Sequence, residues 1–123
     1  MKVLIVDNEP LARDELHYLV EQNSQVTEVL EADGVVSAQQ VVDKEHPDLM
    51  FLDIQLTDGS GMALAESLKN RPNHPYIVFA TAYDQYALDA FDADAIDYLL
   101  KPFSQQRVDD AINRVAKFVK PIR

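Results

Sequence analysis

The feature that most constrains the fold of this chain is a regular alternation of short apolar runs with stretches of helical periodicity. Four runs are apolar on successive residues, as expected for strands covered on both faces, and they span residues 3–6, 49–52, 76–80 and 98–100. A weaker run over residues 26–32 contains Thr27, Glu28 and Glu31, which is typical of an edge strand. Because helical stretches fill the gaps, the sequence predicts an α/β domain with a doubly wound, five-stranded parallel sheet and five helices.

The five expected helices differ in how clearly the sequence marks their ends. Pro10 suits the first turn of the first helix, and residues 35–45 and 61–70 are expected to form the next two. Asp84 is a candidate cap for a short fourth helix. The last helix has the clearest apolar stripe, which recurs every three or four positions at Val108, Ile112, Val115 and Val119. Pro121 is expected to end it.

Length and composition limit the other possibilities. A chain of 123 residues without an internal linker or repeat is expected to form one domain. It contains no cysteine, which excludes disulfides and thiolate metal sites and favours a cytoplasmic location. It shows no signal peptide and no apolar stretch of roughly 20 residues, so no membrane association is expected. The net charge of −10 disfavours direct contact with nucleic acid, since phosphate binding needs Lys and Arg.

Polar side chains follow four of the predicted strands at the point where each strand ends. They are Asp7, Asp53, Thr81 and Lys101. Because the carboxyl ends of parallel strands share one edge of the sheet, where ligands bind, we expect these side chains to converge. Clustered carboxylates suit a divalent cation such as Mg²⁺, and a carboxylate can act as a nucleophile that forms an aspartyl phosphate. The metal and Lys101 can offset the charge of an anionic donor, and Thr81 can donate a hydrogen bond to it.

Four segments carry a resemblance to a known family, and they read VLIVDNEP, LMFLDIQLTDGSG, IVFATAYDQYALDAF and DYLLKPF. They resemble the receiver domain of two-component response regulators, and residues 81–103 are most similar to the LytR/AlgR (LytTR) group. The resemblance covers the whole chain and implies a flavodoxin-like fold with strand order 2-1-3-4-5. Residues 1–123 are then the N-terminal receiver domain of a longer regulator, whose DNA-binding domain is absent from this chain.

The resemblance implies the residues that receive a phosphoryl group and hold the metal. Asp53 is the expected phosphoacceptor, and a sensor histidine kinase is expected to supply the phosphoryl group. Mg²⁺ is expected to be held by Asp7, Asn8, Asp53 and the main-chain carbonyl of Gln55. The domain is not expected to be an enzyme, apart from catalysing its own phosphorylation and dephosphorylation.

The resemblance also implies a conformational switch. Thr81 and Lys101 are expected to contact the phosphoryl oxygens, and Pro102 is expected to follow a cis peptide bond. The ring of Tyr98 is expected to turn inward when Thr81 moves toward the phosphoryl group. The face built from the fourth helix, the fifth strand and the fifth helix then changes shape. This face is the expected homodimer surface and controls transcription, with DNA contacted only through the missing domain.

Asn8 is the most consequential departure from the family pattern, because a metal-binding acidic residue usually stands there. Asn8 keeps a carbonyl oxygen but loses a negative charge. This predicts weaker Mg²⁺ binding, unless the amide oxygen ligates adequately or Glu9 contributes through a water. Tyr83 lies two residues after Thr81, where the family has a residue that flanks the phosphoryl group and tunes its hydrolysis.

Three other functions compete with a phosphorylated receiver. The first is an interaction module of the receiver fold that works without phosphorylation because its metal site is weakened. The second is a phosphatase of the haloacid dehalogenase type, but that class needs a second Asp two residues after the nucleophile, where Gln55 stands. The third is a flavodoxin-like cofactor binder, which would need a Gly-rich phosphate loop after the first strand.

Overall fold

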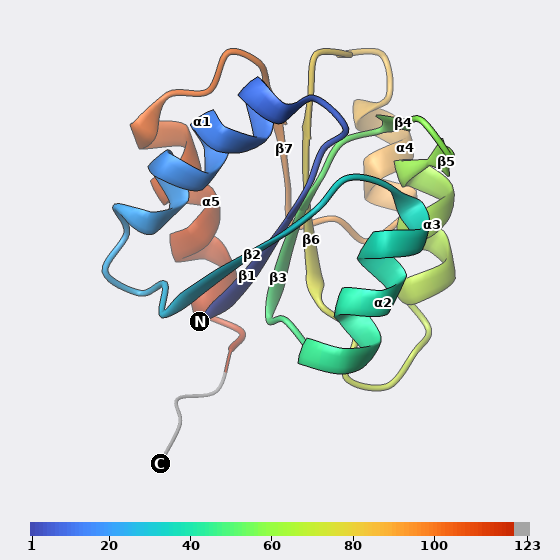
Figure 1. Cartoon of the computed structure of the whole chain (residues 1–123), viewed down its shortest axis with the longest axis horizontal. Helices are drawn as coiled ribbons and strands as arrows, with labels where there is room; N and C mark the ends of the chain where they lie inside the picture. Colours follow the sequence, from blue (N-terminus) through green and yellow to red (C-terminus); the bar gives the residue numbers. More distant parts are fainter. Residues whose placement is uncertain (120–123) are drawn as a thin grey trace.

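The structure is a computed structural model that describes residues 1–119 (Figure 1). Its helices and strands follow in the order β1 (Lys2–Val6), α1 (Pro10–Glu21), β2 (Glu28–Ala32), α2 (Val35–Glu45), β3 (Leu49–Leu52), β4 (Gln55–Leu56), β5 (Gly59–Ser60), α3 (Gly61–Leu68), β6 (Tyr76–Thr81), α4 (Ala87–Asp92), β7 (Asp97–Leu100) and α5 (Gln105–Ala116). The predicted alternation of strands and helices is confirmed. Within the described residues, no helix has the length and apolar character that crossing a membrane requires.

The main sheet has five parallel strands in the order β2-β1-β3-β6-β7. This is the expected order 2-1-3-4-5, since β4 and β5 form a separate two-stranded hairpin that the sequence analysis did not predict. Helices α1 and α5 cover one face of the sheet, and α2, α3 and α4 cover the other (Figure 1). The α/β doubly wound architecture is therefore confirmed.

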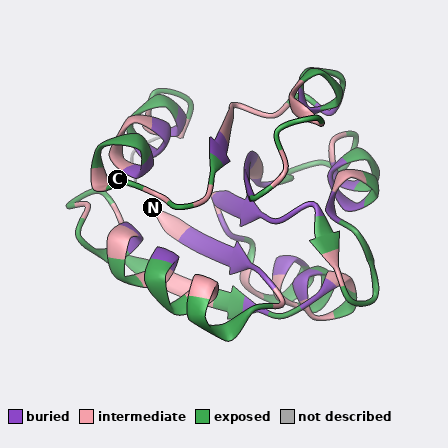
Figure 2. Ribbon diagram, turned by 90° about the horizontal axis from the view of Figure 1, so that it is seen from above, coloured by how far each residue is buried: buried purple, intermediate pink, exposed green. Residues whose placement is uncertain are grey.

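Successive residues of the central strands alternate between two hydrophobic cores, because side chains in a strand point to opposite faces. In β3, Leu49 and Phe51 pack beneath α1 and α5, whereas Met50 and Leu52 pack beneath the other three helices. All four are fully buried, and Figure 2 shows the middle of the sheet enclosed between helices whose outer faces are exposed. This explains why the sequence shows continuous apolar runs instead of an alternating pattern.

Helix ends were predicted less accurately than strands. The expected cap at Asp84 is wrong, because α4 begins at Ala87 after Tyr86 and has no side-chain cap. Helix α5 begins after Ser104, whose hydroxyl accepts a hydrogen bond from the third helical N–H, and it ends at Ala116. Pro121 lies outside the described residues, but the expectation that the helix extends through Val119 to that proline is wrong, because α5 ends before Val119.

The β4–β5 hairpin is attached to helix α2 through the side chain of Asp58. One carboxylate oxygen accepts the N–H of Val35 at 2.7 Å and the other accepts the N–H of Val36 at 3.0 Å. These two bonds lower the pKa of the Asp58 carboxyl. Gly34 makes the close approach possible, since a Cβ there would lie 2.6 Å from Asp58 Oδ1. The loop that follows Asp53 is thereby tied to the neighbouring helix.

Candidate functional site

The four polar side chains expected at the carboxyl edge of the sheet do end their strands there. Val6 pairs with Leu52 in register, so Asp7 and Asp53 follow side by side, and the Asp53 N–H donates to the carbonyl of Val6 at 3.0 Å. Among residues 1–119, the buried polar or charged side chains are Asp7, Asp53 and Thr81. All three were singled out from the sequence. Their burial is expensive without a partner, which indicates a site built for a ligand or a counter-charge.

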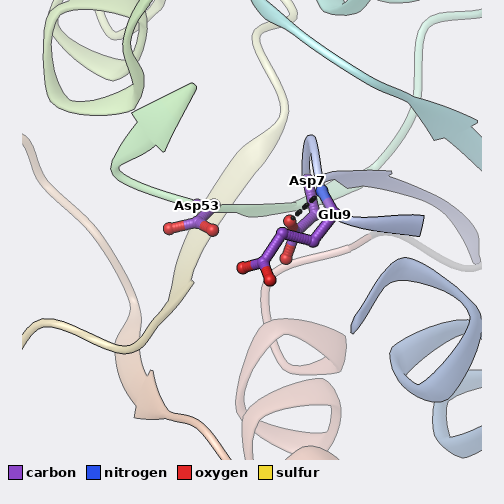
Figure 3. A group of neighbouring side chains, drawn as sticks. All are labelled: Asp7, Glu9 and Asp53. Atoms are coloured by element: carbon purple, nitrogen blue, oxygen red, sulfur yellow. Dashed lines mark hydrogen bonds between the residues drawn. The ribbon is translucent and has the colours of Figure 1, made fainter. Parts of the chain in front are cut away.

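Lys101 supplies that counter-charge from the end of β7. Its ammonium lies 2.9 Å from Asp7 Oδ2, 3.1 Å from Asp53 Oδ2 and 3.3 Å from Glu9 Oε1. Oxygen atoms of the three carboxylates lie within 4.8 Å of one another, and Figure 3 shows the three side chains together at the strand ends. We call this group of four side chains the acidic pocket. Glu9, expected only as a contributor through a water, places its own carboxylate in the group.

Burial and charge shift two pKa values in the acidic pocket in the same direction. Burial raises the pKa of Asp7, which the hydrogen bonds from Lys101 and from the Glu9 N–H only partly oppose. Burial alone would lower the pKa of Lys101, but its hydrogen bonds and charge interactions with Asp7 and Asp53 outweigh this and raise it. The pocket thus favours a cation and disfavours additional negative charge.

Backbone groups hold the two buried carboxylates in place. Asp7 Oδ1 accepts the N–H of Glu9 at 2.9 Å, and Asp53 Oδ1 accepts the N–H of Ile54 at 2.7 Å. The N–H of Gly61 donates to the carbonyl of Ile54 at 2.7 Å, which brings the start of α3 against the Asp53 backbone. A Cβ on residue 61 would lie 1.9 Å from the Asp53 carbonyl oxygen, so only glycine fits there.

The other expected metal-site and flanking residues line the same opening. A cavity of about 260 Å³ is bordered by Asn8, Glu9, Asp53, Gln55, Leu56, Ala82, Tyr83 and Lys101. Asn8 is half-buried, and Gln55 is exposed on the hairpin. The structure therefore brings the expected metal-binding residues to the mouth of the acidic pocket.

A chain of hydrogen bonds leads from Thr81 to Tyr98. Thr81 Oγ1 accepts the N–H of Tyr83 at 3.3 Å, and the Tyr98 hydroxyl donates to the carbonyl of Tyr83. The Tyr98 ring packs at 6.1 Å from the ring of Phe79, and burial raises the pKa of its hydroxyl. The peptide bond before Pro102 is cis, as the resemblance implies.

A five-stranded parallel sheet in this order, with a buried carboxylate ending its central strand beside an ammonium from the last strand, defines the receiver class of signalling domains. The sequence profile of the response regulator receiver domain matches residues 3–113, and the chain belongs to this family. Receiver domains of this family are generally non-enzymatic signalling modules.

Named relatives narrow the assignment to the LytR/AlgR group. Sensory transduction protein LytT of Enterococcus faecalis is 56% identical over 117 residues, which are 95% of this chain and 48% of that protein. Sensory transduction protein LytR of Staphylococcus haemolyticus is 49% identical over 115 residues, 94% of this chain and 45% of that protein. The chain therefore spans about half the length of the curated relatives it matches.

Solved structures agree on the fold. The response regulatory domain of MrkE from Klebsiella pneumoniae superposes with a TM-score of 0.88 at 33% identity, over 96% of this chain and 97% of that one. Receiver domains typically bind Mg²⁺, and the residues here fit that ion. Carboxylate and carbonyl oxygens are the ligands it prefers, and the pocket already holds one cationic group among three carboxylates.

Proposed function

We propose that the domain accepts a phosphoryl group on Asp53 from a sensor histidine kinase, with Mg²⁺ bound beside it, and that this modification controls transcription through a longer regulator. The observation that carries the proposal is the buried Asp53 carboxylate, 3.1 Å from the Lys101 ammonium. A buried carboxylate next to a cation and open to a cavity can receive a phosphoryl group, provided that bound Mg²⁺ offsets the added negative charge. Response regulators interact with sensor histidine kinases, which fits the family membership.

The hydrogen bonds of Asp53 distinguish its two oxygens. Oδ1 accepts the N–H of Ile54, whereas Oδ2 faces Lys101, so we assign Oδ2 as the nucleophile. It forms a bond to phosphorus as the bond from phosphorus to the donor imidazole breaks, and the imidazole leaves with the electron pair. Lys101 and the Thr81 hydroxyl would hold the phosphoryl oxygens. Bound at Asp7, Asn8, Asp53 and the Gln55 carbonyl, Mg²⁺ would supply further positive charge.

The route from Asp53 to the surface follows the hydrogen bonds of Thr81. If the Thr81 hydroxyl turns to the phosphoryl group, it gives up the Tyr83 N–H, and the Tyr83 carbonyl holds the Tyr98 hydroxyl. Tyr98 lies on a cavity of about 240 Å³ between α4, β7 and α5, bordered by Ala87, Ala90, Phe91, Ala95, Ile96, Asp97, Tyr98 and Arg114. We call these residues the output face. Forming or breaking the inward contact between the Tyr98 hydroxyl and the Tyr83 carbonyl would reshape it.

The partners follow from the two ends of this route. Leu11 is exposed at the start of α1, which follows the end of β1, and Tyr18 is exposed further along the same helix, where the kinase would dock. Exposed Leu88 and Phe91 lie on the helix that borders the output face, which would form a homodimer on activation. DNA would be bound by a domain outside residues 1–123, and the half-length match to LytT supports such a domain. The cysteine-free composition favours a cytoplasmic location.

A second candidate function is a receiver-fold interaction module that works without phosphorylation. The observation that favours it is Asn8, which lines the cavity with a neutral side chain where the family usually has a carboxylate. Weaker Mg²⁺ binding would slow phosphoryl transfer, leaving the output face to act in one conformation.

Incubation with acetyl phosphate over a range of Mg²⁺ concentrations tests the proposal, with the modified protein separated on a phosphate-affinity gel. Wild-type protein should be modified in a Mg²⁺-dependent way, and Asp53→Asn should not. Asp14→Asn is the control, because Asp14 is an exposed carboxylate of α1. Asn8→Asp should reach half-maximal modification at a lower Mg²⁺ concentration. An unmodified wild type beside a modified control receiver would favour the interaction module, and modification retained in Asp53→Asn would refute the acceptor.

A further inference from the structure

Arg13 of helix α1 links the acidic pocket to the edge of the sheet. Its Nη1 donates to the main-chain carbonyl of Asp7 at 2.7 Å, and its Nε donates to Glu31 Oε1 on β2 at 3.1 Å. The sequence pattern alone assigns no role to Arg13. A guanidinium presents several N–H groups in one rigid plane, so it holds two acceptors in a more fixed relation than the rotatable ammonium of a flexible lysine does.

The acceptor on the far side of Arg13 is itself fixed. Glu31 belongs to β2 and pairs in register with Ile5 of β1. Its second oxygen lies 2.5 Å from His17 Nδ1, one turn further along α1 than Arg13. The Arg13 side chain is only 19% exposed. Both oxygens of Glu31 are therefore engaged, and the guanidinium plane is set by the sheet edge and the helix together.

The carbonyl that Arg13 holds belongs to the peptide between Asp7 and Asn8. Because a peptide is planar, fixing its oxygen fixes the orientation of the whole unit. The preceding N–H of Asp7 is bound to the carbonyl of Ala32 at 3.2 Å. With both groups held, the direction in which Asn8 leaves the strand end is set.

Arg13 acts on this loop through the backbone. Its Nη1 contacts the main-chain carbonyl of Asp7, whereas the Asp7 carboxylate is engaged by the Glu9 N–H and the Lys101 ammonium. Orientation matters here because Asn8 is uncharged. A carboxylate attracts a cation from several angles, whereas a neutral amide oxygen must point at it.

We propose that Arg13 is a positioning residue for the metal site, which pins the Asp7–Asn8 peptide so that Asn8 presents its amide oxygen to Mg²⁺, and that Glu31 orients Arg13. The inference rests on the proposed function, since it concerns the same metal site. It adds two residues to that site, neither of which touches the metal or the phosphoryl group.

Titration calorimetry of the 123-residue chain with Mg²⁺ tests the inference on Arg13→Met, Arg13→Lys and Glu31→Gln. Loss of a residue that orients a metal ligand typically weakens metal binding about ten-fold, and we expect that loss in both Arg13 variants. Arg13→Lys keeps the charge but loses the rigid plane that fixes the two acceptors relative to each other. Glu31→Gln should give a smaller loss. Arg71→Met is the control, because Arg71 forms a comparable pair with Asp43 on the exposed surface.

Two further measurements separate positioning from plain structural support. The amide signals of Asn8 and Glu9 in NMR spectra should shift in Arg13→Met without Mg²⁺, because the peptide is released. Urea unfolding without metal should show how much stability each variant loses. A purely structural residue would lower that stability and leave the Mg²⁺ affinity of the folded protein unchanged.

The outcomes distinguish the two proposals. Wild type that binds no Mg²⁺ refutes the metal-dependent function, and the inference with it. If wild type binds Mg²⁺, two results overturn the inference alone. One is an Mg²⁺ affinity of Arg13→Met within about two-fold of the wild-type value, and the other is a wild-type Mg²⁺ affinity in Arg13→Lys. If Arg13→Met does not fold, Glu31→Gln decides: unchanged affinity and unchanged amide signals in that variant overturn the inference.

Discussion

Replacing Lys101 by methionine removes the one cation of the acidic pocket while keeping a side chain of similar length. The substitution breaks the ion pairs with Asp7 at 2.9 Å, Asp53 at 3.1 Å and Glu9 at 3.3 Å. The first two carboxylates are 4% and 5% exposed, whereas Glu9 is 66% exposed. Losing one partner of a buried ion pair costs about 3–5 kcal/mol, and an exposed pair contributes about 0–1 kcal/mol. We therefore expect the free energy of unfolding of Lys101→Met, without metal, to be about 3–5 kcal/mol lower than that of wild type.

Urea unfolding followed by circular dichroism at neutral pH in a chelator measures this loss. Domains of this size have about 5–15 kcal/mol of stability, so the variant should remain folded. Mg²⁺ should stabilise Lys101→Met more than wild type, because the ion replaces the missing positive charge between the two carboxylates. Lys69→Met is the control, since Lys69 pairs with Glu66 at the surface and its loss should cost at most about 1 kcal/mol. Equal stability of Lys101→Met and Lys69→Met without metal would refute the reasoning.

Two more perturbations test the backbone and the charge of the same pocket. Asp7→Asn should raise the metal-free stability at neutral pH, because the raised pKa of Asp7 means that its ionised form is disfavoured in the folded state. The gain in stability should be largest above the folded-state pKa of Asp7. It should fade as the pH falls toward the ordinary value of 3.8, where the unfolded chain also binds the proton. Urea unfolding at several pH values measures this gain, and a gain that does not change with pH would contradict the prediction. Gly61→Ala should lose at least about 1–3 kcal/mol, because its Cβ would meet the Asp53 carbonyl oxygen at 1.9 Å. The same variant should also be phosphorylated more slowly by acetyl phosphate. If Gly61→Ala instead has the stability and the phosphorylation rate of wild type, α3 can shift to make room for the Cβ and the prediction is wrong.

The strands were predictable because they depend on short-range patterns with few alternatives, whereas their order was expected from the family resemblance. An apolar run bounded by polar residues specifies a strand covered on both faces, and β3 spans the predicted residues 49–52. Strand ends then specify the site, since a parallel sheet brings its carboxyl ends to one edge. This is why Asp7, Asp53, Thr81 and Lys101 could be grouped from the sequence alone, although Lys101 lies far from the others along the chain.

The rest of the site depends on long side chains whose partners the sequence does not reveal. Arg13 and Glu31 resemble ordinary surface charges until the register of β1 and β2 is known. Asp58 resembles a turn residue, but it caps a helix that precedes it in the chain. For Glu9 the sequence suggested only a possible contribution through a water, and it does not reveal that the carboxylate lies 3.3 Å from Lys101.

Assembly from distant strand ends has a consequence for the newly made chain. Lys101 is the last residue of the acidic pocket to leave the ribosome, and it reaches the carboxylates only when β7 pairs with β6. A shorter nascent chain contains Asp7 and Asp53 but lacks their ammonium partner. Until β7 has formed and joined the sheet, the proposed acceptor Asp53 therefore lacks the ammonium that lies beside it in the folded domain.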